Sequence, residues 1–179
     1  MDINLFVNIT SRAWSMPILS SLYEGVPGRQ APLLKATGAS RTAFAQSIAH
    51  LIDIGLLERN PGYGHPLRPE FRLTDTGKTA ALIASKIPVI SEKEDKVLLR
   101  RSWTLPILSS LQKPAHFNEI KRNLPSITDR ALSQSLRSME DRKWVKRDVI
   151  EEARPPKPIY QSINMGETIS KFIAPEIYF

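Results

Sequence analysis

The sequence predicts a mainly α-helical protein with small β-hairpins, an α+β fold in which one domain plan occurs twice. The main observation is an internal repeat, because the nine residues that begin at Trp14 return, with few changes, at Trp103, 89 residues later. Solenoid proteins repeat about every 20–50 residues, so a repeat of this length indicates a duplicated domain. Later matched positions keep the same register to within one residue. We therefore expect two domains, residues 1–89 and residues 90–179.

The composition is typical of a folded protein from a reducing compartment. The chain has 179 residues, of which 41% are hydrophobic, and it has no cysteine. Without cysteine there is no disulfide, no thiolate metal ligand and no thiol redox switch. The first residues lack the basic start and the apolar run of a signal peptide, and no apolar stretch approaches the ~18 residues of a membrane span. We therefore expect a cytoplasmic protein.

Positive charge is shared between the two halves of the chain. The formal net charge is +7, and residues 1–89 hold 9 basic and 6 acidic residues, whereas residues 90–179 hold 16 and 12. Two basic halves favour double-stranded DNA as a partner over one basic tail on a neutral domain.

In the second half, the apolar residues first predict two short helices. The segment that begins at Trp103 has helical spacing, and Pro106 fits near the start of this helix, where a missing N–H costs little. Apolar residues at spacings of three and four over residues 117–124 predict a second helix. Pro125 ends this helix, because proline disfavours helical backbone at the residue before it.

A third helix is expected from about Thr128 to Arg142. Thr128 lies where an N-cap residue is needed, because its hydroxyl can accept a hydrogen bond from the first turn. Leu132, Leu136 and Met139 follow at helical spacing and predict one buried stripe.

Two strand-like segments follow the third helix. Residues 144–145 begin a strand, the proline-rich residues 151–158 form a loop, and residues 159–163 return as a strand. Gly166 precedes a final helix. Three short helices followed by a β-hairpin make the plan of a winged helix-turn-helix domain, in which the hairpin is the wing.

The first half follows the same order. Ser40 takes the N-cap position of its third helix, and Gly55 ends that helix as a C-cap glycine does. Residues 60–69 correspond to the wing loop, residues 71–74 to the return strand, and Gly77 opens the closing helix. The sequence thus predicts tandem duplicated winged helix-turn-helix domains.

These segments resemble the HxlR-type winged-helix transcriptional regulators, which are relatives of the MarR group. In the second half, residues 103–108 resemble the opening helix of that family, residues 124–136 its recognition helix with the preceding turn, and residues 155–160 its wing. In the first half, residues 66–77 resemble the wing and the closing turn. The resemblance covers nearly the whole chain, with one family unit in each half, and it implies a DNA-binding regulator that acts as a repressor.

The chain also departs from the family pattern. Members usually carry one winged helix and pair as homodimers, and many carry a cysteine near the N-terminus that is missing here. Lys143 replaces the glycine that ends the second recognition helix, and Ser162-Ile163 replaces the Leu-Thr pair of the return strand. The recognition helix of the first half differs at residues 41–45.

The recognition helix of a winged-helix domain lies in the major groove, with its N-terminal residues toward the base edges. In the second half, the buried stripe leaves six polar residues for the outer face: Thr128, Asp129, Arg130, Ser133, Gln134 and Arg137. Arginine suits guanine and glutamine suits adenine, so we expect Arg130 and Gln134 to determine specificity. Thr128 and Ser133 suit phosphate contacts.

In the first half, the corresponding candidates on the recognition helix are Ser40, Arg41, Thr42 and Gln46, with His50 as a further one. Arg68 and Lys157 occupy matching wing positions, from which a cation can reach the backbone or the minor groove. Each candidate also has a purely structural interpretation. Ser40 and Thr128 are then helix caps only, and exposed arginine and glutamine belong to a solvated helix face.

The sequence predicts no cofactor, no metal site and no catalytic site. It contains no Walker loop and no nucleophile elbow, and its three histidines lack metal-ligand spacing. The function we expect is that of a sequence-specific DNA-binding repressor, which reads two half-sites of an operator with two non-identical recognition helices.

Several alternatives stay open at this level. One chain would act as a monomeric pseudo-dimer, or two chains would form a homodimer through the apolar terminal segments. A small-molecule effector could bind between the halves, although no residue pattern indicates one. Tandem winged helices also serve as protein-interaction scaffolds in chromosome segregation, but those proteins tend to be acidic, whereas both halves of this chain are basic.

Overall fold

A computed structural model describes residues 1–60, 70–150 and 157–179 of the chain. The described residues form two units, one of residues 12–89 and one of residues 1–11 together with residues 90–179. In this division the first eleven residues pack with the second half, whereas the sequence placed them in a first domain of residues 1–89.

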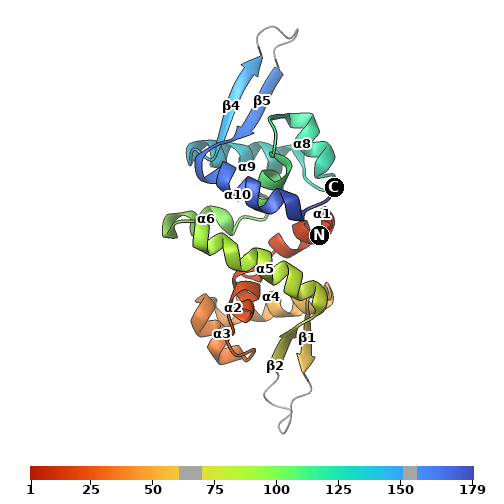
Figure 1. Ribbon diagram of the computed structural model, residues 1–179, viewed down its shortest axis with the longest axis vertical. Coiled ribbons are helices and arrows are strands. Elements are labelled where there is room, and N and C mark those ends of the chain that lie inside the picture. The colour runs from red at the N-terminus through yellow and green to blue at the C-terminus, as the bar shows by residue number, and fades with distance from the viewer. Residues whose placement is uncertain (61–69, 151–156) are drawn as a thin grey trace. The chain divides into compact units, whose positions relative to one another are not determined.

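The unit of residues 12–89 contains helices, then a β-hairpin, then a long helix. In chain order these elements are α2 (Ser15–Tyr23), α3 (Gln30–Thr37), α4 (Arg41–Asp53), β1 (Leu57–Asn60), β2 (Glu70–Leu73) and α5 (Asp75–Ile90). The two strands are antiparallel, with Leu57 opposite Leu73 and Asn60 opposite Glu70. The hairpin extends away from the helices of its unit (Figure 1).

Aromatic packing joins the third helix of this unit to its hairpin. Phe44 on α4 and Phe71 on β2 are buried and pack edge to face, with their ring centroids 6.5 Å apart. Ile48 and Leu51 continue the buried stripe of α4, as the apolar spacing predicts. The opposite face of α4 is therefore free for another role.

The other unit repeats this order with additional short elements. They are α1 (Ile3–Thr10), η1 (Lys93–Asp95), α6 (Lys96–Leu99), α7 (Thr104–Ser110), β3 (Ala115–His116), α8 (Phe117–Asn123), α9 (Asp129–Asp141), β4 (Val145–Ile150), β5 (Lys157–Ser162), α10 (Asn164–Ile173) and η2 (Ala174–Glu176). The strand order is β3-β5-β4, and both pairings are antiparallel. The β4–β5 hairpin extends beyond the helices of this unit (Figure 1).

Backbone pairing ties the N-terminal segment to the end of the chain. The amide of Ile3 donates to the carbonyl of Tyr178 at 3.0 Å, and the amide of Tyr178 donates to the carbonyl of Met1 at 3.0 Å. Phe6 and Ile9 on the same helix are buried, and α1 contacts α7. These contacts explain why residues 1–11 belong to this unit.

In each unit, a glycine of the closing helix lets this helix come close to the backbone carbonyl of the third residue beyond the third helix. A Cβ atom at Gly77 would lie 2.0 Å from the carbonyl oxygen of Leu56, and one at Gly166 would lie 2.1 Å from that of Trp144. Real Cβ atoms essentially never come this close, so these two sites require glycine.

The expected α+β class is confirmed, since helices dominate and the sheets are small and antiparallel. The expected third helix of the second half is confirmed as α9. Within the described ranges, no helix is long and apolar enough to cross a membrane.

Candidate nucleic-acid interface

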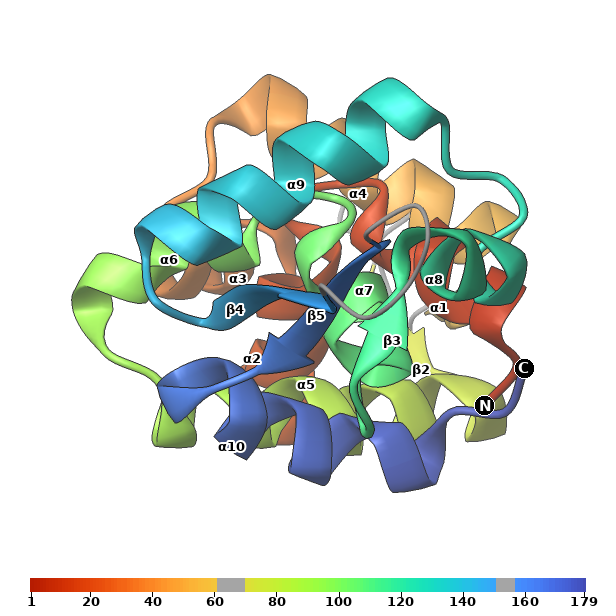
Figure 2. The same ribbon diagram turned by 90° about the horizontal axis from the view of Figure 1, so that it is seen from above.

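Helix α9 forms where its capping residue and apolar spacing predict it. The hydroxyl of Thr128 accepts a hydrogen bond from the amide of Ala131 at 3.2 Å, which satisfies one N–H of the first turn. Leu132, Leu136 and Met139 are buried along one face. Within its unit, α9 runs along the side opposite to α10 (Figure 2), so its other face points away from the core.

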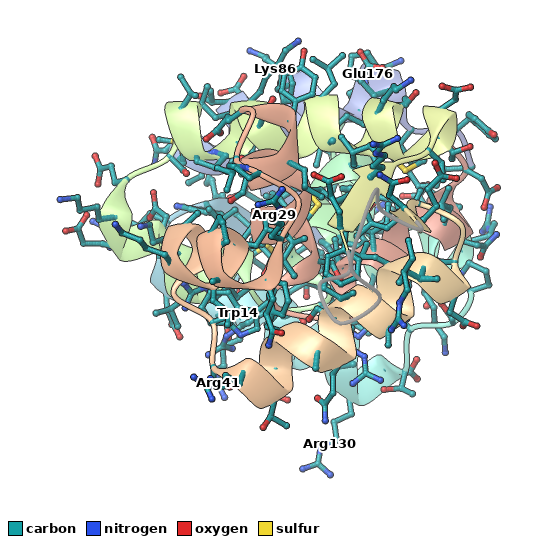
Figure 3. All side chains as sticks on the ribbon, turned by 90° about the horizontal axis from the view of Figure 1, so that it is seen from below. Trp14, Arg29, Arg41, Lys86, Arg130 and Glu176 are labelled. Atoms are coloured by element: carbon teal, nitrogen blue, oxygen red, sulfur yellow. The ribbon has the colours of Figure 1, made fainter. Side chains whose placement is uncertain are left out.

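The outer face of α9 is polar and exposed. The residues that the sequence singled out are all exposed: Thr128, Asp129, Arg130, Ser133, Gln134 and Arg137. Asp141, at the end of the helix, is exposed as well. Arg130 and Gln134 are four residues apart and therefore lie one above the other on successive turns. Figure 3 shows the side chain of Arg130 extending away from the helix. Such a row of long polar side chains fits the edges of base pairs in a major groove.

Asp129 has a partner within the protein. Its carboxylate forms an ion pair with the ammonium group of Lys121 on α8, and both side chains are partly exposed. The pair joins α8 to the first turn of α9, where a negative charge also interacts favourably with the helix dipole. The position of Asp129 is therefore at the edge of the outer face, on the side of α8. Its role in DNA contact stays a prediction.

A residue outside α9 reaches its outer row, and the sequence did not predict it. The guanidinium Nη1 of Arg101 donates to the hydroxyl of Ser138 at 2.8 Å, and this hydroxyl donates to the carbonyl of Gln134 at 3.0 Å. Ser138 lies one turn beyond Gln134, so Arg101 brings an exposed cation to the same row. The repeat contained a signal for it, because Arg12 precedes Trp14 as Arg101 precedes Trp103.

Helix α4 presents a comparable outer face in the other unit. The hydroxyl of Ser40 accepts from the amide of Ala43 at 3.3 Å, as expected for an N-cap. The exposed residues of α4 toward its start and middle are Arg41, Thr42, Ala45, Gln46 and Ala49. Figure 3 shows Arg41 at the beginning of this helix. His50 is only half exposed, so it is a weaker candidate than the others.

Of the two candidate wing cations, Lys157 lies among the residues that the structure describes. Lys157 is exposed at the start of β5, where it is paired in register with Ile150 of β4. Arg68 lies outside the described residues. The hairpin of the first unit ends where Asn60 and Glu70 face each other, and the side-chain amide of Asn60 donates to the carboxylate of Glu70 at 3.1 Å.

Charge at the Asn60–Glu70 end of this hairpin is balanced locally. The hydrogen bond from Asn60, together with the positive charges of Arg72 and Arg29, lowers the pKa of the Glu70 carboxyl below its ordinary value. Arg72 approaches this carboxylate at 3.6 Å. Glu70 is therefore ionised at neutral pH, which keeps this end of the hairpin polar and paired.

Metal ligands are not gathered at this surface. Over the part of the chain that the structure describes, no three histidine, cysteine or acidic side chains lie close enough together to hold a metal ion. The exposed side chains on the outer faces of α4 and α9 include hydroxyl, amide and guanidinium groups, which bind phosphates and base edges.

The chain is similar to known helix-turn-helix proteins. The sequence model of the HxlR-like helix-turn-helix family matches residues 98–175, which span α7 to α10. The uncharacterised HTH-type transcriptional regulator YvaP of Bacillus subtilis (strain 168) is 32% identical over 82 residues, which are 46% of this chain and 75% of that protein.

Two solved structures also match about half of this chain. One is a Porphyromonas gingivalis W83 protein assigned to the MarR family, with 21% identity, a TM-score of 0.42, and coverage of 48% of this chain and 89% of that one. The other is the reduced form of YodB from B. subtilis, with 26% identity, a TM-score of 0.40, and coverage of 47% and 82%. From the family match and the identity to YvaP, this chain belongs to the HxlR-like helix-turn-helix family of transcriptional regulators.

Proposed function

We propose that this protein is a sequence-specific regulator that binds double-stranded DNA through the outer face of α9. The observation that carries this proposal is the row of Arg130 and Gln134 on successive exposed turns, within the helix-turn-helix that matches the family. In this position Arg130 donates two hydrogen bonds to a guanine, and Gln134 pairs with an adenine. Thr128 and Ser133 contact phosphates and set the register of the helix on the duplex.

We propose further that α4 reads a second half-site. Both helices have thirteen residues, and both begin after a hydroxyl N-cap that binds the amide three residues later. Both end before a residue with positive φ, Gly55 in one unit and Lys143 in the other. Beyond each helix, a backbone carbonyl lies close to a glycine of the closing helix, Gly77 in one unit and Gly166 in the other. These local similarities support a tandem duplication in which both units bind DNA.

One chain would then bind both half-sites, as two chains do in a homodimer. A dimer of identical winged helices reads a palindrome, because its recognition helices are equal. A single chain with two unlike helices instead reads two unlike half-sites as a monomeric pseudo-dimer. Repression is the mode of action that the family resemblance favours, since a protein bound over two half-sites blocks access to the DNA between them.

A protein-interaction scaffold is the alternative function. The basic charge of both halves and the family membership disfavour it. A scaffold would bind DNA weakly, without sequence preference and with strong dependence on salt.

The test is selection of bound sequences from a random duplex pool at near-physiological salt, with the full chain. We expect one enriched motif, and we expect Arg130→Ala to relax it at one base pair. The matched control is Lys171→Ala, which removes an exposed cation from α10, on the side of the unit opposite to α9 (Figure 2), and should leave the motif unchanged. If no sequence is enriched, the proposal is wrong and the scaffold function takes its place.

A further inference from the structure

We infer that the two recognition helices require half-sites of different base composition: α9 reads a half-site that contains G·C pairs, and α4 reads an A·T half-site partly through thymine methyl groups. This inference rests on the proposed function, in which both helices enter a major groove. It adds which bases each helix selects and why the operator has no symmetry.

The two helices correspond residue by residue. Ser40 and Thr128 are equivalent caps, 88 residues apart, and each accepts from the amide three residues later. The buried positions Phe44 and Leu132 keep the same spacing from these caps. Each outer position of α4 therefore has one defined counterpart on α9.

The centre of the outer face is where the chemistry differs. A helix turns by about 100° per residue, so the second, fifth, sixth and ninth residues after the N-cap share one face. On α9 the exposed residues there are Arg130, Ser133, Gln134 and Arg137. On α4 the exposed counterparts are Thr42, Ala45, Gln46 and Ala49.

On α9, this face carries two guanidinium groups. Arginine donates two hydrogen bonds to the O6 and N7 atoms of guanine, which is the commonest specific contact in the major groove. Arg130 is near the N-terminus of the helix, where base edges are reached. A G·C pair in the half-site of α9 satisfies this side chain, whereas an A·T pair presents a donor in place of the O6 acceptor.

On α4, the same face is short and largely apolar. Thr42, Ala45 and Ala49 present methyl groups, and methyl groups of alanine and threonine pack against the C5-methyl of thymine. Gln46 adds a side-chain amide that suits adenine. Short side chains also let the helix approach the bases closely, so this face selects A·T pairs.

Arg41 does not change this assignment. Its counterpart on α9 is Asp129, which forms an ion pair with Lys121 on the neighbouring helix α8. This first position of the helix therefore points to the side of the outer face, toward the preceding helix. From there Arg41 contacts a phosphate, which positions the helix and carries no sequence preference.

The first experiment measures how tightly the full chain binds a duplex with the sequence selected from a random pool. Replacing thymine by uracil removes only the C5-methyl group, so we expect uracil in the A·T half-site to weaken binding about fourfold for each lost contact. Replacing guanine by 7-deazaguanine in the other half-site removes the N7 acceptor of the base that Arg130 reads, and we expect a larger loss. Equal base composition in the two half-sites, or uracil without effect, would overturn the inference.

A second experiment introduces arginine into α4 at the positions where α9 has Arg130 and Arg137. The double variant Thr42→Arg with Ala49→Arg changes two exposed residues, so the fold should be kept, which its unfolding temperature checks. We expect a G·C pair to appear in the former A·T half-site, while the other half-site stays unchanged.

The matched control is Thr79→Arg, an exposed position on α5. Figure 3 shows α5 on the side of this unit opposite to α4, so the added cation should not alter the selected sequence. If the double variant selects the same sequence as the natural chain, α4 does not read bases, while the function of α9 stands. Failure to enrich any sequence with the natural chain would instead overturn the proposed function itself, and this inference with it.

Discussion

The carboxylate of Asp95 accepts two hydrogen bonds from the guanidinium group of Arg142, 3.0 Å from Nε and 2.8 Å from Nη2. The side chain of Asp95 is 3% exposed, whereas that of Arg142 is 42% exposed. Arg142 is the residue that follows α9, and Asp95 ends η1 at the start of the second half. The pair therefore fixes the C-terminal end of α9 to the segment that precedes α6.

We predict that Asp95→Asn lowers the unfolding temperature, because it removes the charge that Arg142 pairs with and keeps the shape of the side chain. The other oxygen of Asp95 accepts from the amide of Glu92 at 2.9 Å, so this turn also loses a charged acceptor. The control is Glu94→Gln, an exposed carboxylate on the same turn, for which we expect little change. Equal unfolding temperatures of the two variants would contradict the prediction.

Lys143 provides a second prediction, about the end of α9. Its φ of 59° lies in the left-handed region, where a residue with a Cβ atom is strained and glycine is not. Gly55 occupies the equivalent position after α4, with φ of 74°. We expect Lys143→Gly to raise the free energy of unfolding by about 0.5–1 kcal/mol, since the relief of strain exceeds the extra flexibility of the unfolded chain.

The control for Lys143 is alanine, which removes the charge and keeps the Cβ atom. Denaturant unfolding should show no such gain for Lys143→Ala. A similar gain in both variants would mean that loss of the charge, and not relief of backbone strain, is the cause.

The sequence predicted the features that depend on neighbours along the chain. Residues such as Thr128 and Leu132 fix the start and the buried face of α9 through local spacing, so the helix and its outer face follow from the sequence alone. The departure at Lys143 was also visible, because the repeat places a glycine at the matching site. The structure adds that the backbone keeps the left-handed conformation there despite the side chain.

Contacts between distant segments could not be predicted in this way. The backbone hydrogen bonds of Ile3 with Tyr178 move the first helix from the expected first domain to the other unit, and no local pattern encodes such pairing. The ion pair of Lys121 with Asp129 joins two helices, and the hydrogen bond of Arg101 with Ser138 joins the segment before α7 to α9. Charge patterns along the sequence do not specify these partners.

A third prediction concerns pH and the hairpin of the first unit. The folded-state pKa of Glu70 is lowered, chiefly by the hydrogen bond from Asn60 and next by the charge of Arg72. A lowered pKa means that this carboxylate stabilises the fold at pH values above its ordinary pKa of 4.5, and that the contribution is lost as the pH falls through the lower folded-state value. We therefore expect Glu70→Gln to be less stable than the natural chain at pH 6.

This difference between Glu70→Gln and the natural chain should shrink when unfolding is measured at pH 3. Glu58→Gln changes an exposed carboxylate on the neighbouring strand and serves as the control. If the difference were the same at both pH values, the ionisation of Glu70 would not be what stabilises the hairpin.

The last prediction separates base contacts from phosphate contacts in the second half. We expect Arg130→Ala to weaken binding to the selected duplex by about 1–3 kcal/mol, which is roughly 5- to 150-fold, and to have a smaller effect on unrelated duplexes. Lys157→Ala should instead weaken binding to every duplex and reduce the salt dependence of log K by about one unit, because one phosphate contact is lost. Titrations of both variants against selected and scrambled duplexes at several salt concentrations measure these effects. Equal losses of Arg130→Ala on both duplexes would make Arg130 a phosphate contact, and an unchanged salt slope for Lys157→Ala would remove the wing from the interface.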